Sequence, residues 1–165
     1  MTTDFLTRLA TFVTLCFVQS LVLNNIHIFG CATPLLYVYF VLQFRRNYPK
    51  WAILLWCFCL GVAIDTFSNT PGVTSASLVV IGAIQPYYFE MFLPQEAADD
   101  LKPSVRNMGS VKFLFYSFVL TLLFCSLFFT LETFNFFNWV QWIECVGGSA
   151  VLTMVLILTI ESVRK

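Results

Sequence analysis

Apolar residues occur along this chain in long, nearly unbroken runs, and polar or helix-breaking residues lie between the runs. A helix needs about 20 residues to cross a hydrocarbon core of about 30 Å, so each run near that length predicts one transmembrane helix. The pattern predicts an all-α bundle of six transmembrane helices, at residues 5–23, 29–44, 51–67, 73–92, 111–131 and 139–160.

The breaks between the runs indicate how the helices are connected. The second run is the shortest, and it contains Pro34 near its start, where the missing N–H of proline costs a helix least. Pro71 and Gly72 separate the third and fourth runs and predict a tight external turn. Residues 93–110 form the only long hydrophilic stretch, which predicts a cytoplasmic loop with room for one short surface helix.

Composition places the chain among integral membrane proteins. Of its 165 residues, 59% are apolar, 18% are aromatic and only 11% are charged, and the mean hydropathy is +0.82. A soluble globule of this size cannot bury so much apolar surface. The first run has the hydrophobicity of a signal peptide, but Asp4 weakens the basic start and no small-residue cleavage site precedes Asn24. We therefore expect a retained first helix within a single transmembrane domain over residues 1–165.

The cationic residues are distributed on one side of the predicted membrane. They occupy four places that are separated by even numbers of apolar runs, which predicts both termini in the cytoplasm. The formal net charge is zero, and no basic patch typical of nucleic-acid binding is indicated. The four places are Arg8, the turn with Arg45, Arg46 and Lys50, the loop with Lys102, Arg106 and Lys112, and the terminal Arg164 and Lys165.

Polar side chains form a layer near the predicted outer face. A rise of about 1.5 Å per residue puts Asp65, Glu144 and Gln19 at similar depths, with Asn69 at the surface above them. A carboxylate in hydrocarbon is costly and usually marks a function or a buried partner. Because no Lys or Arg belongs to this face, the layer predicts a protonated or hydrated carboxyl, or a basic or amide group from another protein. The alternative for Asp65 is structural, with its carboxylate capping a helix end and bonding to residues 66–69.

Small residues within the runs predict close contacts between helices. Gly61, Gly147 and Gly148 are the main examples, since glycine lets two helix backbones touch in a membrane. Such contacts can form within the bundle or with a partner helix, and packing within the bundle is favoured.

Signals of catalysis are missing from the sequence. The six cysteines have neither CxxC spacing nor neighbouring histidines, so they predict buried thiols rather than a metal site. No hydrolase or metalloprotease motif and no phosphate-binding glycine-rich loop is present. We expect no catalytic residues, no metal and no cofactor.

One set of residues carries a resemblance to a known family. Gly61 and Asp65, followed by Thr70-Pro71-Gly72, resemble the Gly-x-x-x-Asp and Pro-x-Gly-like pattern of the rod shape-determining protein MreD family. Residues 21–25 and Pro34 fit the same pattern, as do the chain length, the six runs and the basic turns. The resemblance covers essentially the whole chain.

The resemblance implies a non-enzymatic protein of the bacterial inner membrane that belongs to the cell-elongation machinery. Its implied partners are the bitopic protein MreC, the actin-like MreB filament, RodA and a class B penicillin-binding protein. The implied architecture is also similar to that of the S components of energy-coupling-factor vitamin transporters.

Two hypotheses follow for the function. In the first, the bundle is a membrane adaptor that binds the transmembrane helix of MreC and links cytoplasmic filaments to peptidoglycan synthesis. In the second, it is a carrier subunit that binds a small molecule such as a vitamin through Asp65, Asn69, Gln141 and Glu144.

Overall fold

A computed structural model describes residues 2–21, 34–93, 101–133 and 139–164 of the protein. All regular secondary structure within these residues is helical, which confirms the all-α prediction for the described part of the chain. The helices are α1 (Thr2–Leu21), α2 (Val38–Leu42), α3 (Lys50–Ser68), α4 (Val73–Glu90), α5 (Val105–Met108), α6 (Ser110–Thr133) and α7 (Trp139–Arg164).

Three of the described helices are long and apolar enough to cross a membrane. They are α3, α6 and the part of α7 from Trp139 to Val163, while α1 contains a shorter apolar stretch, Leu6–Gln19. These helices support membrane insertion, as the composition predicts. The count of six spans and the cytoplasmic location of the termini stay predictions.

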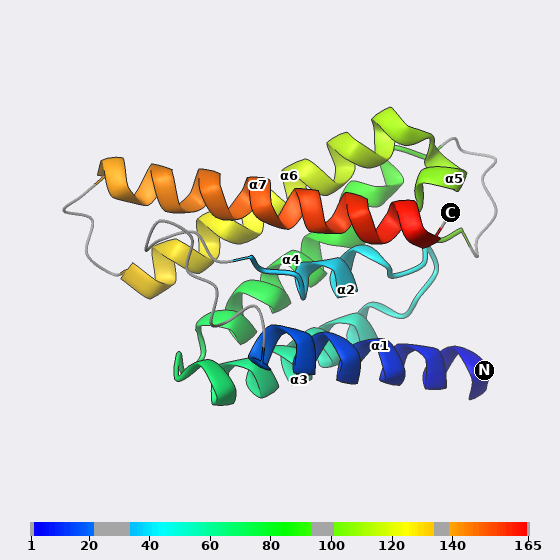
Figure 1. Ribbon diagram of the computed structural model, residues 1–165. Coiled ribbons are helices and arrows are strands. Elements are labelled where there is room, and N and C mark those ends of the chain that lie inside the picture. The colour runs from blue at the N-terminus through cyan, green and yellow to red at the C-terminus, as the bar shows by residue number, and fades with distance from the viewer. Residues whose placement is uncertain (1, 22–33, 94–100, 134–138, 165) are drawn as a thin grey trace.

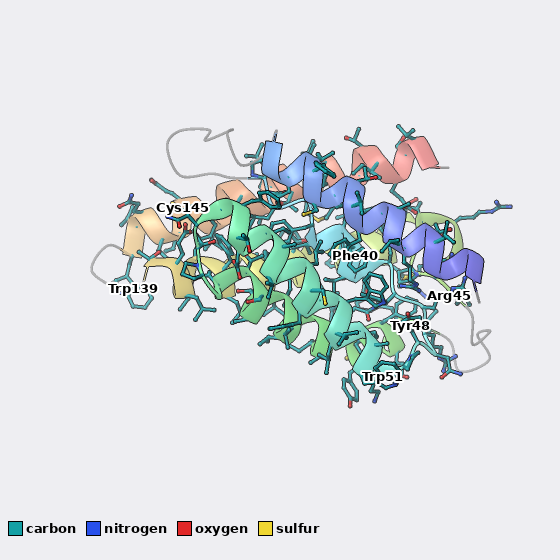
Figure 2. The ribbon with its side chains drawn as sticks, turned by 90° about the horizontal axis from the view of Figure 1, so that it is seen from below. Phe40, Arg45, Tyr48, Trp51, Trp139 and Cys145 are labelled. Atoms are coloured by element: carbon teal, nitrogen blue, oxygen red, sulfur yellow. The ribbon has the colours of Figure 1, made fainter. Side chains whose placement is uncertain are left out.

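The long helices run side by side in one bundle (Figure 1). α3 packs against α4, α4 against α6, and α6 against α7, while α1 packs against α3. The start of α1 and the end of α7 lie at the same end of the bundle (Figure 1). Figure 2 shows Arg45, Tyr48 and Trp51 at that end and Trp139 at the other. Tryptophan is typical of membrane interfaces, so the two Trp positions are consistent with the two faces of a bilayer.

The structure differs from the expected helix at residues 29–44. Residues 34–37 are not helical, and α2 has only five residues. The turns around it are tight, since the N–H of Tyr39 donates to the carbonyl of Leu36 (3.0 Å), three residues back. Residues 29–33 lie outside the described part of the chain. Irregular backbone at membrane depth is tolerated only where protein or a cavity surrounds it, and every residue from 34 to 42 is buried.

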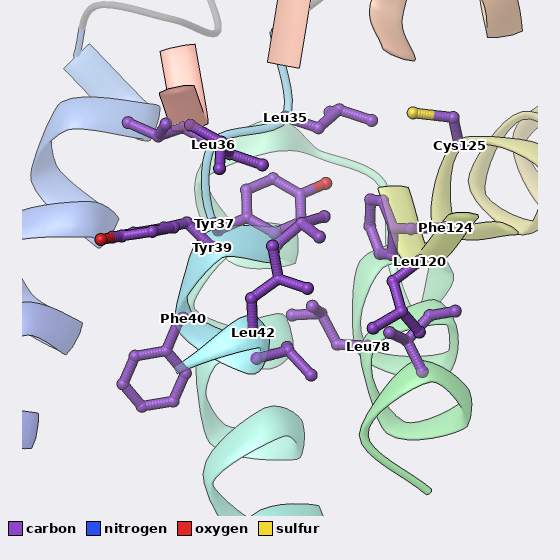
Figure 3. Packing of buried hydrophobic residues seen from close by; sticks show 14 of the residues in the cluster. Leu35, Leu36, Tyr37, Tyr39, Phe40, Leu42, Leu78, Leu120, Phe124 and Cys125 are labelled. Carbon is purple, nitrogen blue, oxygen red and sulfur yellow. The ribbon is translucent and has the colours of Figure 1, made fainter. Parts of the chain in front are cut away.

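The side chains of residues 34–44, here called the central segment, fill the core of the bundle. The Tyr37 ring meets Phe124 of α6 edge-on, with 5.4 Å between ring centroids. Phe40 lies 6.1 Å from both Phe12 of α1 and Trp56 of α3. Figure 3 shows Tyr37 turned toward Phe124 while Tyr39 and Phe40 point to the other side of the segment. Residues 34–42 of the apolar run are therefore buried by protein, which explains their uniform hydrophobicity without contact with lipid.

Candidate functional site

Asp65 lies near the C-terminal end of α3 and is 6% exposed. Its Oδ1 atom accepts hydrogen bonds from the Thr74 N–H (2.9 Å) and the Thr70 hydroxyl (3.3 Å). Its Oδ2 atom accepts from the Ser75 N–H (3.0 Å) and the Gly72 N–H (3.1 Å). The first N–H groups of a helix have no partner within the helix and carry a partial positive charge. The carboxylate of Asp65 therefore caps α4, the helix that follows its own.

This geometry corrects the sequence-based view that Asp65 lacks an internal counter-charge. The charge is balanced by the N-terminus of α4, so no cation from another protein is needed at this position. The alternative that Asp65 caps a helix end has the right kind of interaction, but the groups that donate to the carboxylate are different ones. Asp65 bonds to residues 70–75, whereas the sequence suggested 66–69. Asn69 is exposed and ends α3 with a left-handed φ of 56°, a conformation that asparagine tolerates.

Gly61 and Gly72 make the close approach of α3 and α4 possible. A Cβ atom on Gly61 would lie 2.2 Å from Cα of Ser75, which is backbone and cannot move aside. Gly72 has a φ of +86°, in the left-handed region that favours glycine, and it directs its N–H to Asp65. Pro71 is exposed in the same turn. Gly61 thus has a packing role and Pro71 and Gly72 have turn roles, as the sequence predicts, and all three lie in the hairpin formed by α3 and α4.

Gln19 of α1 contacts the central segment rather than Asp65. Its Nε2 donates to the carbonyl of Pro34 (3.0 Å) and its Oε1 accepts from the N–H of Leu36 (3.1 Å). One buried amide thus replaces two backbone partners that a continuous helix would have supplied. The hydrogen bonds of the Gln19 side chain thus go to the central segment, and its similar depth to Asp65 stays a prediction.

Two residues of α7 also bond to the central segment, and neither was predicted from the sequence. The Thr153 hydroxyl accepts from the Leu35 N–H (3.0 Å) and donates to the Ser149 carbonyl (2.7 Å). The Glu161 carboxylate accepts from the Tyr39 hydroxyl (3.1 Å) and is 6% exposed. Glu161 is a carboxylate near the end of an apolar run, and that position was the available signal.

Glu144 lies on a face of α7 that is turned away from the rest of the described bundle. Glu144 and Gly147 are exposed, as are Val151 and Val155 one and two turns further along. A Cβ atom on Gly147 would meet no atom within 4 Å, and Gly148 is half-buried. Of the three glycines predicted to pack closely, Gly147 therefore makes no close contact within the described residues.

The basic residues gather at the end of the bundle where Trp51 lies. The Arg8 guanidinium lies over the rings of Phe44 (4.8 Å) and Tyr48 (4.2 Å). Lys50 donates to the Tyr87 hydroxyl (3.0 Å). Arg45 and Arg46 are half-buried in the turn before α3. These contacts bring α1, the basic turn and the end of α4 together, which agrees with one shared face for these cations.

The ligand groups named for a carrier do not converge among the described residues. Asp65 is engaged by the N-terminus of α4, while Gln141 and Glu144 are exposed on α7. A cavity is present at the other end of α7, beside Glu161. The described residues contain no group of three or more His, Cys, Asp or Glu placed to hold a metal ion.

Comparison with known proteins adds no relative. No protein-family model, curated protein or solved structure matches this chain.

Proposed function

We propose that the chain is a non-enzymatic adaptor of the MreD family in the bacterial inner membrane. In this role it maintains rod shape by linking MreC, the MreB filament, RodA and a class B penicillin-binding protein. The resemblance in sequence is the basis of the proposal. Among its described residues, Gly61 lies against Ser75 and Asp65 bonds to Gly72, so the residues of the α3–α4 turn are in contact.

The observation that carries the adaptor role is the exposed face of α7, defined by Glu144, Gly147, Val151 and Val155. Glu144 lies five residues after Trp139, hence about 7.5 Å along the helix from the predicted boundary. An exposed carboxylate at this depth is costly in lipid, and Gly147 leaves room for a second backbone. A partner helix with a basic or amide side chain at this depth would pair with the Glu144 carboxylate and pack its backbone against Gly147.

The transmembrane helix of MreC is the partner that the family resemblance implies. Because Asp65 is engaged within the bundle, we assign the contact with the partner helix to Glu144 instead. Valines on the same face supply packing surface, since helices in lipid associate by close van der Waals contact and by hydrogen bonds.

Co-purification from native membranes tests this proposal. Tagged wild-type chain should recover MreC, and Glu144→Leu should recover several-fold less at equal abundance of the chain. Phe58→Leu is a matched control, because Phe58 is an exposed residue of α3 and lies outside the α7 face. Absence of MreC both in detergent extracts and after cross-linking in cells would refute the adaptor role.

A further inference from the structure

α1 lies beside the central segment and contacts it at several points along its length (Figure 1). The two run antiparallel, because the end of α1 meets the start of the segment and the start of α1 meets its end. The contacts are of three kinds, an amide bonded to backbone, two aromatic rings edge to face, and a guanidinium over a ring. They join Gln19 to Pro34 and Leu36, Phe12 to Phe40 at 6.1 Å, and Arg8 to Phe44 at 4.8 Å.

The side chains that make these contacts lie on one face of α1. Counted from Arg8, Phe12 and Gln19 lie four and eleven positions further along. Leu15 lies seven positions along and is buried as well. This spacing keeps side chains on one face of a helix. Phe17 lies on another face and is 61% exposed, so the helix has a side that contacts the segment and a side that faces outward.

α1 buries fewer side chains than the neighbouring long helices. Among its described side chains, at residues 6–19, Leu15 and Gln19 are buried, whereas α3, α4 and α6 each bury at least seven residues. Helices in lipid are held together by van der Waals packing and hydrogen bonds. Elements with few buried contacts open locally before the rest of a structure unfolds. We therefore expect α1 to separate from the bundle more easily than α3, α4 or α6.

The other side of the central segment is held by contacts that do not involve α1. The Thr153 hydroxyl of α7 accepts from the Leu35 N–H (3.0 Å), and the Tyr37 ring packs edge-on against Phe124 of α6. α6 and α7 also pack against each other. The segment therefore keeps its contacts with α6 and α7 when α1 moves away.

We infer that α1 is a strap that opens and closes over the central segment while the rest of the bundle stays assembled. In the closed state Gln19 bonds to the carbonyl of Pro34 and the N–H of Leu36. Opening leaves both backbone groups without that partner, at a cost in free energy, so the closed state is the resting one. Opening uncovers the side of the segment that carries Phe40. The strap is formed by α1 and the partner face by α7, so the inference is independent of the proposed function.

Hydrogen exchange of the full chain in lipid nanodiscs, followed by mass spectrometry, tests the strap. Phe12→Ala removes the ring that meets Phe40 and Trp56, which makes the open state more populated. Exchange at residues 38–44 should rise about tenfold or more, while exchange in α4 and α6 stays as in wild type. Phe12→Leu, which keeps part of the packing, should give a smaller rise at the same residues. Phe17→Ala is the matched control, because it removes an exposed ring from the same helix and should leave exchange at residues 38–44 unchanged.

A covalent link between α1 and α3 provides the opposite test. The rings of Phe12 and Trp56 lie 5.8 Å apart, so cysteines at these two positions can be joined by a short bifunctional thiol reagent. The native cysteines are replaced by alanine for this purpose. The linked protein should exchange more slowly at residues 38–44 than the same protein before linking. The inference is overturned if both Phe12 variants leave exchange at residues 38–44 unchanged, if they raise it equally in α4 and α6, or if the link has no effect.

Discussion

The α3–α4 hairpin and the central segment solve the same problem in opposite ways. Each contains backbone N–H groups that no carbonyl of a continuous helix accepts. In the hairpin, one carboxylate nearby in the sequence satisfies them, since Asp65 reaches the Gly72, Thr74 and Ser75 N–H groups. In the central segment the acceptors come from distant helices, Gln19 of α1 and Thr153 of α7. Local capping lets two long helices meet at a tight turn, whereas remote capping permits a break in the middle of the bundle.

The largest expected effect comes from removing the local cap. Asp65→Asn puts an NH₂ group against backbone donors and removes the charge that α4 stabilises, so we expect a loss of about 3–5 kcal/mol in unfolding free energy. Reversible unfolding in mixed micelles measures it. Thr66→Val on the exposed side of the same helix is the control, because the Thr66 hydroxyl bonds only to its own helix at Val62. Equal stability of the two variants would contradict the capping role.

The second prediction compares the stability effect of alanine at Gly61, which is packed against α4, with that at Gly147, which is open. Gly61→Ala forces α3 and α4 apart, because its Cβ would lie 2.2 Å from Cα of Ser75, and overpacking of this kind costs about 1–3 kcal/mol or more. Gly147→Ala meets no atom within 4 Å and should leave the isolated protein unchanged or stabilise it by about 0.5–1 kcal/mol. The same unfolding measurement compares them, and a larger loss for Gly147→Ala would reverse the assignment.

Removal of a remote cap should cost less and act on the central segment alone. Gln19→Met keeps the shape of the side chain but leaves the Leu36 N–H without an acceptor, at a cost of about 1–3 kcal/mol. Hydrogen exchange should rise at residues 34–37 and stay unchanged at the start of α4. Faster exchange at both places would show that the two regions are not separate.

The smallest of these effects is expected at Thr153. Thr153→Val removes one acceptor from the Leu35 N–H, which predicts a loss of about 1 kcal/mol. Thr159→Val is matched to it in the same helix, because the Thr159 hydroxyl is exposed and bonds only to the carbonyl of Val155. The midpoint of thermal unfolding should fall for Thr153→Val alone. An equal fall for Thr159→Val would show that the hydrogen bond to the Leu35 N–H does not cause the loss.

The two regions also differ in how far the sequence predicts them. The helices around Asp65 begin and end close to the predicted limits, because long apolar runs and the Pro71-Gly72 break are local signals. The identity of the helix that Asp65 caps depends on how the turn folds back, so its donors were misplaced. Packing and turn roles for Gly61 and Gly72 were predictable from their residue types.

The central segment was less predictable because hydrophobicity does not distinguish lipid from protein as the surrounding medium. The segment belongs to the apolar run at residues 29–44, which the sequence assigns to a span, yet its side chains are buried among neighbouring helices. Depth along a helix says nothing about which neighbour a side chain meets, and Gln19 bonds to Pro34 and Leu36. The contact of Glu161 with Tyr39 joins residues that are 122 positions apart, a pairing for which one sequence carries no local signal.

Site-specific photocross-linking along α7 in living cells tests the central claim, that Asp65 and Gln19 are engaged within the bundle while the α7 face meets a partner helix. A photoreactive residue at Gly147, Val151 or Val155 should capture MreC, and one at the buried Ala150 or Met154 should give only products within the chain. MreC captured equally from both sides of the helix, or from neither, would contradict the account.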